Sequence, residues 1–437
     1  MHLSTLFGFG AATLASAANS RFVLYYDQWH TTDIPPKSLT RDVTHVMMSF
    51  TPSSLFSEVG EDANPNDAKP FQPIKNVRAL FDHDIKVCLA IGGWGDNDGF
   101  GEGSKSDRTR ENFARNVAAA LDRFGFDCVD VDWEYPGGNG EDYKRIPNSK
   151  KKDEIKAFPK LLLAIKKFIG NKELSIAVPG LKRDMIAYIA SESPRINSAV
   201  DFVNVMSYDL MNRRDQYTTH HTSVQGTLRA IDNYLALGFP ACKLVLGIPF
   251  YAKWFTTKKG YTCDNPIGCP TELLEEPTNG TDTGKSGSVT FEAANFVPVP
   301  TNLTTSPDAT CGAGTFFKCA DSLCCGGSGW CGDTPGHCGG GCQPAFGGRC
   351  DGADTSTSFQ RALAQGRTDV EAGAQWYWDA ENRLFWSWDT AELIAQKMSL
   401  AAKTRGVKSV MAWSLAQDGH DWSHLEAMKK GFEANNA

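Results

Sequence analysis

The chain has 437 residues, carries a formal net charge of −7 at pH 7, and is 22% charged and 11% aromatic. This length suits one large α/β domain with an additional module, and the composition is that of an ordinary soluble globular protein. The mildly acidic balance argues against nucleic acid or an anionic membrane surface as a partner, and no stretch after the N-terminal segment approaches the ~20 apolar residues of a membrane span. We expect a monomer with neither of these partners.

The first residues predict a secretory signal peptide that spans residues 1–17. An apolar stretch over 3–15 leads into the small-residue sequence Ala-Ser-Ala at 15–17, where we place cleavage. The alternative is an apolar first strand of the mature domain. Thirteen cysteines, eight of them within 311–350, agree with an oxidising destination. The sequence thus predicts a secreted, extracellular protein.

Short β-rich runs alternate along the chain with amphipathic helical stretches, a pattern typical of a parallel α/β fold. The apolar runs that we expect to form strands are Phe22–Asp27, Val43–Phe50, Ile85–Ile91, Cys128–Trp133, Leu174–Val178, Phe202–Tyr208, Leu244–Phe250 and Val407–Trp413. The clearest helices, each followed by glycine, are Arg110–Phe124, Lys156–Ile169 and Ser223–Leu237. Eight strands in this alternation predict a closed (β/α)₈ barrel, although counting alone leaves a doubly wound sheet as an alternative.

The alternation breaks after Tyr251, where a polar stretch rich in Gly, Thr, Pro and Cys runs to about residue 366. A structureless loop of that length is implausible inside a compact domain, so we expect an inserted unit. The pattern resumes with two short aromatic strands at Ala374–Asp379 and Arg383–Trp388. We therefore assign 18–255 to the first part of the barrel, 256–373 to the insertion region, and 374–437 to the end of the insertion subdomain and the last part of the barrel.

The most informative segment is FDCVDVDWEYP at 126–136. On a strand, side chains alternate between faces, so Asp130, Asp132 and Glu134 share one face while Val129, Val131 and Trp133 share the other. In a barrel wrapped by helices, the apolar set faces the helices and the acids face the interior. The alternative, a strand with one solvated face, suits an antiparallel edge and not a parallel strand covered on both faces.

Three neighbouring carboxyl groups in a barrel interior are costly unless some are protonated or hydrogen-bonded. One of them therefore has a raised pKa and can act as an acid near neutral pH. Glu134 is furthest along the strand and hence nearest the C-terminal face, where the active sites of such barrels lie. The sequence predicts Glu134 as a proton donor.

The segment at 126–136 resembles the DxxDxDxE signature of glycoside hydrolase family 18. Four further segments resemble this family, each at the end of an expected strand: AIGGW (90–94), MSYD (206–209), LVLGIPFY (244–251) and VMAWSL (410–415). The resemblance covers nearly the whole chain outside the insertion. It implies a (β/α)₈ barrel and a chitinase, an enzyme that cleaves β-1,4-linked N-acetylglucosamine polymers without a metal or cofactor.

The resemblance also implies a substrate-assisted mechanism in place of a second catalytic carboxylate. Glu134 would protonate the leaving oxygen, while the 2-acetamido carbonyl of the −1 sugar attacks C1 to give an oxazolinium ion. Asp132 would orient the acetamide N–H, Asp130 would tune Asp132, and Tyr208 would hydrogen-bond the acetamide oxygen. The substrate-binding positions implied in the same way are Tyr26, Gly93, Trp94, Tyr135, Met206, Asp209 and Trp413. For Tyr26, Trp94 and Trp413, the residues alone leave a purely structural core role open.

One position departs from the family pattern, which has serine where this chain has Ala90. Loss of that hydroxyl donor should make an ionised Asp130 less favourable, and we expect a shifted pH profile with activity retained.

The segment 311–350 combines eight cysteines with little apolar content, which predicts a disulfide scaffold. Spacing alone allows 105 pairings. A zinc site that uses the paired cysteines and His337-Cys338 is the alternative. The segment resembles a hevein-type chitin-binding module, and this implies the pairs Cys311–Cys325, Cys319–Cys331, Cys324–Cys338 and Cys342–Cys350.

Only part of the sugar-binding face of such modules is present. Trp330 occupies an aromatic position, whereas Ser328 and His337 stand where the family usually has aromatic residues. Each lost aromatic removes a stacking contact, so we expect weak chitin binding, and a purely structural module remains an alternative.

The rest of the insertion should form a small α+β subdomain that walls the cleft. Its tryptophans are candidates for substrate contacts or for the subdomain core: Trp376, Trp378 and Trp386. Cys263 and Cys269 can close a short loop. An odd number of cysteines is left (Cys88, Cys128 and Cys242), so we expect at least one buried free thiol.

Two other functions compete with chitin hydrolysis. A chitin-recognising lectin on an inactive barrel is disfavoured by the presence of Glu134. An endo-β-N-acetylglucosaminidase acting on N-glycans is disfavoured by the hevein-like segment and the cleft wall, because both features suit a polymer.

Overall fold

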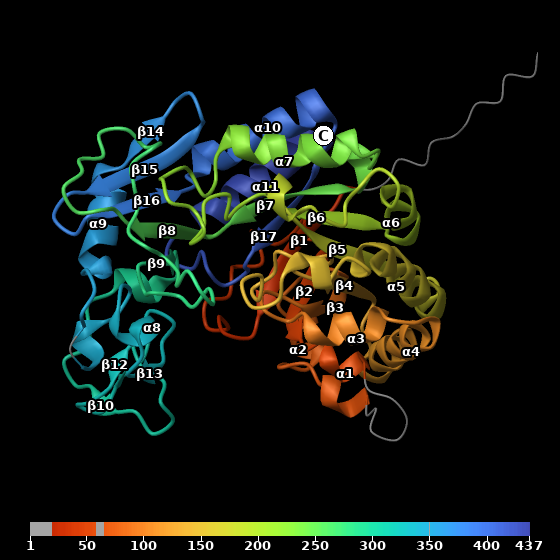
Figure 1. The fold of residues 1–437 in the computed structure, drawn as a ribbon, viewed down its shortest axis with the longest axis horizontal. Helices are drawn as coiled ribbons and strands as arrows, with labels where there is room; N and C mark the ends of the chain where they lie inside the picture. The colour runs from red at the N-terminus through yellow and green to blue at the C-terminus, as the bar shows by residue number, and fades with distance from the viewer. Residues whose placement is uncertain (1–19, 58–64, 349) are drawn as a thin grey trace, which may run out of the picture.

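The structure, a computed structural model, describes residues 20–57, 65–348 and 350–437 (Figure 1). The expected signal peptide lies outside the described residues. No helix in the described part of the chain is long and apolar enough to cross a membrane.

Eight parallel strands close into a barrel in the order β1-β17-β7-β6-β5-β4-β3-β2. They are β1 (Phe22–Asp27), β2 (His45–Thr51), β3 (Lys86–Gly92), β4 (Cys128–Asp132), β5 (Glu173–Pro179), β6 (Phe202–Met206), β7 (Leu244–Pro249) and β17 (Ser409–Trp413). Each coincides with an expected strand within a residue or two at its ends. The closed barrel is confirmed, and the open-sheet alternative is excluded.

Helices cover the outside of the barrel (Figure 1). They are α1 (Ser54–Ser57), α2 (Ile74–Arg78), α3 (Asp98–Ser104), α4 (Asp107–Phe124), α5 (Glu154–Ile169), α6 (Ser193–Ala199), α7 (Val224–Ala236), α10 (Ala391–Arg405) and α11 (Ser423–Asn436). Short 3₁₀ turns lie at Pro65–Ala68, Asn148–Lys150, Lys182–Asp184, Ala241–Lys243, Ala293–Phe296 and Pro344–Phe346. Helix α4 begins with a capping box at Ser106 and ends at Gly125, whose φ of 80° a glycine adopts without strain.

The two faces of β4 separate as the alternation predicts. Val129, Val131 and Trp133 belong to the apolar layer between barrel and helices, and the Trp133 ring stacks on Phe100 with centroids 5.3 Å apart. Asp130 and the other acids point into the barrel interior, where burial is complete or nearly so. This packing makes the strand rigid and fixes the direction of its carboxyl groups.

A five-stranded antiparallel sheet, in the order β14-β15-β16-β8-β9, forms the insertion subdomain. Its strands are β8 (Tyr251–Thr256), β9 (Ser286–Thr290), β14 (Arg367–Asp369), β15 (Ala374–Asp379) and β16 (Leu384–Trp388), and helix α9 (Thr355–Gln365) packs against it. Strand β8, which the sequence assignment placed within the barrel, pairs in this sheet. Trp376 and Trp386 are buried in subdomain clusters, so they are core residues, and Trp378 is half-buried.

The cysteine-rich segment forms a separate small unit beside β9 (Figure 1). It contains β11 (Phe317–Lys318), β12 (Cys324–Cys325), β13 (Cys331–Gly332) and α8 (Pro335–Cys338), and β10 (Thr304–Thr305), just before the segment, pairs with β11. Its disulfides join Cys311–Cys325, Cys319–Cys331, Cys324–Cys338 and Cys342–Cys350, which confirms all four expected pairs and leaves these thiols no role as zinc ligands.

This module is docked firmly onto the subdomain sheet. Gly340 donates its backbone N–H to the Gly284 carbonyl over 2.6 Å. A Cβ atom at Gly340 would lie 2.2 Å from the Trp254 indole, and one at Gly287 of β9 would lie 2.8 Å from the same indole. The buried Trp254 ring therefore contacts both the module and β9, and only glycine allows so close an approach.

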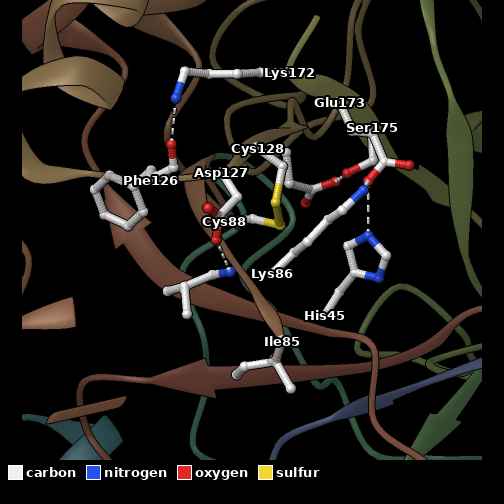
Figure 2. The surroundings of a disulfide bond; sticks show 12 residues. His45, Ile85, Lys86, Cys88, Phe126, Asp127, Cys128, Lys172, Glu173 and Ser175 are labelled. Carbon is white, nitrogen blue, oxygen red and sulfur yellow. Dashed lines mark hydrogen bonds and ion pairs between the residues drawn. A yellow bond between two sulfur atoms is a disulfide. The ribbon is translucent and has the colours of Figure 1, made fainter. Parts of the chain in front are cut away.

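The remaining cysteines differ partly from expectation. Cys263 pairs with Cys269, and Cys88 pairs with Cys128 across neighbouring positions of β3 and β4 (Figure 2). Cys242 is the free thiol among the described residues, and it is exposed, so the expectation of a buried thiol was wrong. Cys242 is exposed because it lies in the turn that precedes β7, and turns at this end of the barrel face the solvent.

Candidate active site

A cleft of about 870 Å³ opens at the C-terminal ends of the barrel strands. Sequence-predicted residues that line it are Gly93, Trp94, Asp132, Glu134, Tyr135, Met206, Tyr208, Asp209 and Trp413. Asp130 lies deeper in the barrel and is fully buried. The described structure thus brings together all but one of the predicted barrel residues, and the exception is Tyr26.

Tyr26 does not contact the acids. Its ring packs with Phe71 on the outer side of β1, and its hydroxyl accepts a hydrogen bond from the Gln72 amide over 2.8 Å. The preceding residue, Tyr25, is the one whose hydroxyl donates to Asp130 at 2.7 Å. The prediction was wrong because a shift of one residue along a strand moves a side chain to the opposite face.

Asp130 is held by three side-chain donors. Besides Tyr25, the hydroxyl of Ser175 donates at 2.6 Å and the amide of Asn204 at 3.2 Å. Burial raises the pKa of Asp130, and these hydrogen bonds act against that rise. In the strand register, Asp130 lies opposite Ala90 of β3 on one side and Ser175 of β5 on the other. The hydroxyl that is lacking at Ala90 is therefore supplied from the neighbouring strand.

Asp132 lies between the deep and the exposed ends of the acidic strand. Burial and the negative charges of Glu134 and Asp130 raise its pKa well above the usual range. Its Oδ1 atom is buried and has no hydrogen-bond partner among the described residues. A buried acceptor left in this state is costly, and it is ready to accept an N–H group from a ligand.

Glu134 follows β4 at the floor of the cleft. Burial raises its pKa to about 7, and the negative charges of Asp209 and Asp184 act in the same direction. A hydrogen bond from Tyr135 and the positive charge of Arg214 lower the pKa. Glu134 is therefore protonated in much of the population at neutral pH, as a general acid requires.

Asp209 has the opposite character. Burial favours its neutral form, but Lys253 and His221 override this effect and hold the pKa of Asp209 well below its usual range. The Tyr251 hydroxyl donates to Asp209 at 2.9 Å, and the Lys253 Nζ atom lies 3.0 Å from its carboxylate. One wall of the cleft thus carries a fixed anion, supported by β8 of the subdomain.

Aromatic rings line the rest of the cleft. Trp413 stacks on Phe50, with ring centroids 5.4 Å apart and an interplanar angle of 17°, so its plane is fixed at the floor. Trp94 is 49% exposed and meets Tyr135 edge to face. Trp29, which follows β1 and was missed from the sequence, is 59% exposed and also lines the cleft.

Several other residues were missed, and some left a signal in the sequence. Ser175 and Asn204 are polar residues at inward-facing positions of otherwise apolar strands, a pattern that indicates a buried polar partner. Arg214 lies in the loop between β6 and α7, and no strand periodicity applies there.

In the cysteine-rich module, Trp330 is the exposed aromatic among the three predicted sugar-contact positions, with 46% of its surface accessible. Ser328 is exposed beside it. The His337 imidazole is hydrogen-bonded to the Thr334 hydroxyl at 2.7 Å and lies close against Gly332. The module therefore presents one aromatic platform at these positions.

A (β/α)₈ barrel whose central cleft holds a row of carboxyl groups, one of them a glutamate with a raised pKa, belongs to the class of barrel glycoside hydrolases. The family model "Glycosyl hydrolases family 18" matches residues 21–418, and the chain belongs to this family. Curated relatives include a chitinase-like effector of Moniliophthora roreri, 26% identical over 59% of this chain and 64% of that protein, and Chitotriosidase-1 of Mus musculus, 28% identical over 52% and 50%. The chain spans about half the length of the curated relatives it matches.

Solved structures share the fold at low identity. The Group IV chitinase of Ostrinia furnacalis matches with a TM-score of 0.63 and 19% identity over 95% of this chain and 100% of that one. A Cycas revoluta chitinase of the same family, solved in complex with (GlcNAc)3, matches with a TM-score of 0.61 and 19% identity over 94% and 100%.

Proposed function

We propose that this protein is a secreted chitinase that hydrolyses β-1,4 bonds between N-acetylglucosamine units with retention of configuration. The observation that carries this proposal is the buried, unpartnered Oδ1 atom of Asp132 directly beside Glu134, which is protonated near neutral pH. The carboxyl groups near Glu134 are poor nucleophiles, because Asp132 has a strongly raised pKa and Asp209 is paired with Lys253, and this suits a substrate that supplies its own nucleophile. The 2-acetamido group of N-acetylglucosamine is such a nucleophile.

In the proposed reaction, Glu134 gives its proton to the glycosidic oxygen as the bond to C1 breaks. The acetamide carbonyl oxygen forms a bond to C1, and the resulting oxazolinium ion carries the positive charge. Asp132 accepts the acetamide N–H through Oδ1, which orients the group and stabilises the cation. Glu134, now a carboxylate, takes a proton from water as the water oxygen bonds to C1. The bond between C1 and the acetamide oxygen breaks in the same step, which restores the acetamido group and the protonated Glu134.

The surroundings supply orientation. Trp413, fixed by its stacking on Phe50, suits the apolar face of the −1 sugar, and Tyr208 lines the cleft next to Asp132. The requirement for an acetamide at −1 excludes cellulose and xylan. The disulfide-rich module, held against the cleft wall through Trp254, adds a weak chitin-binding surface centred on Trp330.

The test is hydrolysis of colloidal chitin by the wild type and by Glu134→Gln, whose amide has no proton to donate. We expect soluble N-acetylglucosamine oligomers from the wild type and a loss of at least about a hundredfold in the variant. Glu111→Gln, the same change at an exposed site on α4, is the matched control and should behave like the wild type. In the wild type, the rate should fall as the pH rises through about 7, because Glu134 then loses its proton.

Other outcomes discriminate against the proposal. A wild type that binds chitin but releases no product would make this protein a lectin. Release of glycans from glycoproteins, with chitin left intact, would assign the same chemistry to N-glycan trimming.

A further inference from the structure

Arg214, in the loop between β6 and α7, lies between two aromatic rings at the edge of the cleft. Its guanidinium carbon is 4.0 Å from the centroid of the Tyr143 ring and 5.5 Å from that of the Trp94 ring. The side chain is only 12% exposed, although it lines the cleft. A guanidinium over an aromatic face is attracted by the negative charge of the ring face and fixes the orientation of that ring.

The polar atoms of the same guanidinium are directed at the protein. Nη2 donates to the Gly140 carbonyl at 2.9 Å, and Nη1 lies 3.6 Å from the buried Asp184 carboxylate. Arg214 thus connects the loops that follow β3, β4 and β5, which carry Trp94, Gly140 and Asp184 respectively. Both terminal nitrogens are thus directed at protein groups, and Arg214 can act on a substrate through the residues that it holds.

Arg214 is also close to the proton donor. A Cβ atom at Gly140 would lie 2.6 Å from the Glu134 carbonyl oxygen, so the segment that accepts the Arg214 hydrogen bond packs directly on the Glu134 backbone. The charged and titratable groups that face the Glu134 carboxyl from the surrounding elements are Asp132, Tyr135, Asp184, Tyr188, Tyr208, Asp209, Arg214 and Tyr251. Arg214 is the cation in this set, and its positive charge acts against the neighbouring carboxyl groups, although burial, Asp209 and Asp184 influence the pKa of Glu134 more strongly.

We propose that Arg214 is a positioning residue that fixes Trp94 as the platform for the sugar on the leaving-group side and places a positive charge beside Glu134. This inference rests on the proposed function. Its two parts are separable, because the first needs the flat guanidinium and the second needs only a cation. Arg214 also lies over the Tyr143 ring, and the Tyr143 hydroxyl is in turn hydrogen-bonded to Glu275 of the insertion.

Two variants separate the parts. Arg214→Met removes both the positive charge and the planar guanidinium group. Arg214→Lys keeps the positive charge and removes only the planar group. Arg145→Met is the matched control, since Arg145 lies on the same loop as Gly140 but pairs with Glu141 at the surface. Each protein is assayed on the N-acetylglucosamine hexamer and on chitobiosyl fluoride. The pH runs from about 4 to 10, a range that covers the ionisation of Glu134. The fluoride leaving group cannot reach Trp94.

For both Arg214 variants, we expect the KM for the hexamer to rise about threefold to tenfold, the usual weight of a cation–π contact, with little change for the fluoride. Arg214→Met should also move the alkaline limb of kcat/KM to higher pH by about half a unit, since loss of a cation raises the pKa of Glu134. Arg214→Lys should keep the wild-type limb, and Arg145→Met should match the wild type throughout.

The inference is overturned if Arg214→Met, folded by its thermal unfolding curve, keeps the wild-type KM and the wild-type alkaline limb. An equal fall in kcat on both substrates, with no shift of the limb, would also overturn it, because that pattern reflects general loosening of the site. If the wild type itself cleaves neither substrate, the proposed function fails first and this inference fails with it.

Discussion

The barrel and the disulfide-rich module are stabilised by different kinds of interaction. The barrel buries two layers of apolar side chains, one between strands and helices and one inside the strand ring. The module has a small cluster around Phe346 in which cysteines make up much of the apolar content, and four disulfides hold it together. A segment of this size cannot bury enough apolar surface alone, so covalent bonds and a docking contact replace a core.

The module contacts the insertion subdomain at Trp254 of β8 and not the barrel, so damage should spread differently from the two regions. A defect in the barrel core should lower the stability of the whole catalytic domain and displace the acids on β4. A defect in the module should remain local, because the module is connected to the domain mainly through close backbone contacts at Gly284 and Gly340.

The largest expected effect comes from Trp133→Ala. The Trp133 ring is 1% exposed and packs against Phe100 and Phe158, so its loss should cost about 3–5 kcal/mol of unfolding free energy. Denaturant unfolding of the full chain measures this cost. Leu163→Ala on the exposed side of α5 is the control, with an expected change under about 1 kcal/mol. Equal costs for the two variants would contradict the account of the core.

Removal of one module disulfide by the double change Cys324→Ser and Cys338→Ser should be nearly as costly, but only locally. We expect the module to lose about 2–5 kcal/mol and to become sensitive to limited proteolysis within residues 311–350. Hydrolysis of the soluble hexamer should stay within about twofold of the wild type, because the acids belong to the barrel. A parallel loss of hexamer activity would show that the module supports the cleft.

The sequence predicted the barrel well because its strands are buried on both faces and read as continuous apolar runs with regular spacing. The positions of Asp130, Asp132 and Glu134 followed, since strand alternation places their side chains on the inward face of β4 and near its end. The errors arose where one residue decides the face, as at Tyr26, or where exposure depends on the surrounding turns, as at Cys242. Arg214 was missed because contacts between loops depend on the closed barrel itself.

A smaller effect tests the replacement of the hydroxyl lacking at Ala90. Ser175→Ala removes one donor to buried Asp130 and should cost about 1–2 kcal/mol at neutral pH. Burial already raises the folded-state pKa of Asp130, and loss of Ser175 raises it further. The variant should therefore lose stability relative to the wild type as the pH rises above the folded-state pKa of wild-type Asp130, which itself lies above the ordinary value.

A residue on the neighbouring strand β3, Ala90, provides a control for this change. Ala90→Ser in the Ser175→Ala background places a hydroxyl on the other side of Asp130, and unfolding curves should show partial recovery at neutral pH. A cost that does not depend on pH would mean that Ser175 contributes packing and does not stabilise the carboxylate.

The smallest effect on stability should come from Trp330→Ala in the module. Trp330 is 46% exposed and packs in no apolar cluster of the described residues, so the change in unfolding free energy should stay within about 0.5 kcal/mol. Binding to insoluble chitin, measured in the Glu134→Gln background to prevent hydrolysis, should weaken about threefold to tenfold, the usual weight of one aromatic stacking contact. The reciprocal variant Ser328→Trp adds a second exposed ring and should strengthen binding by a similar factor. If neither change alters the amount of protein bound, the module is a structural part of the cleft wall, and the binding surface is confined to the barrel.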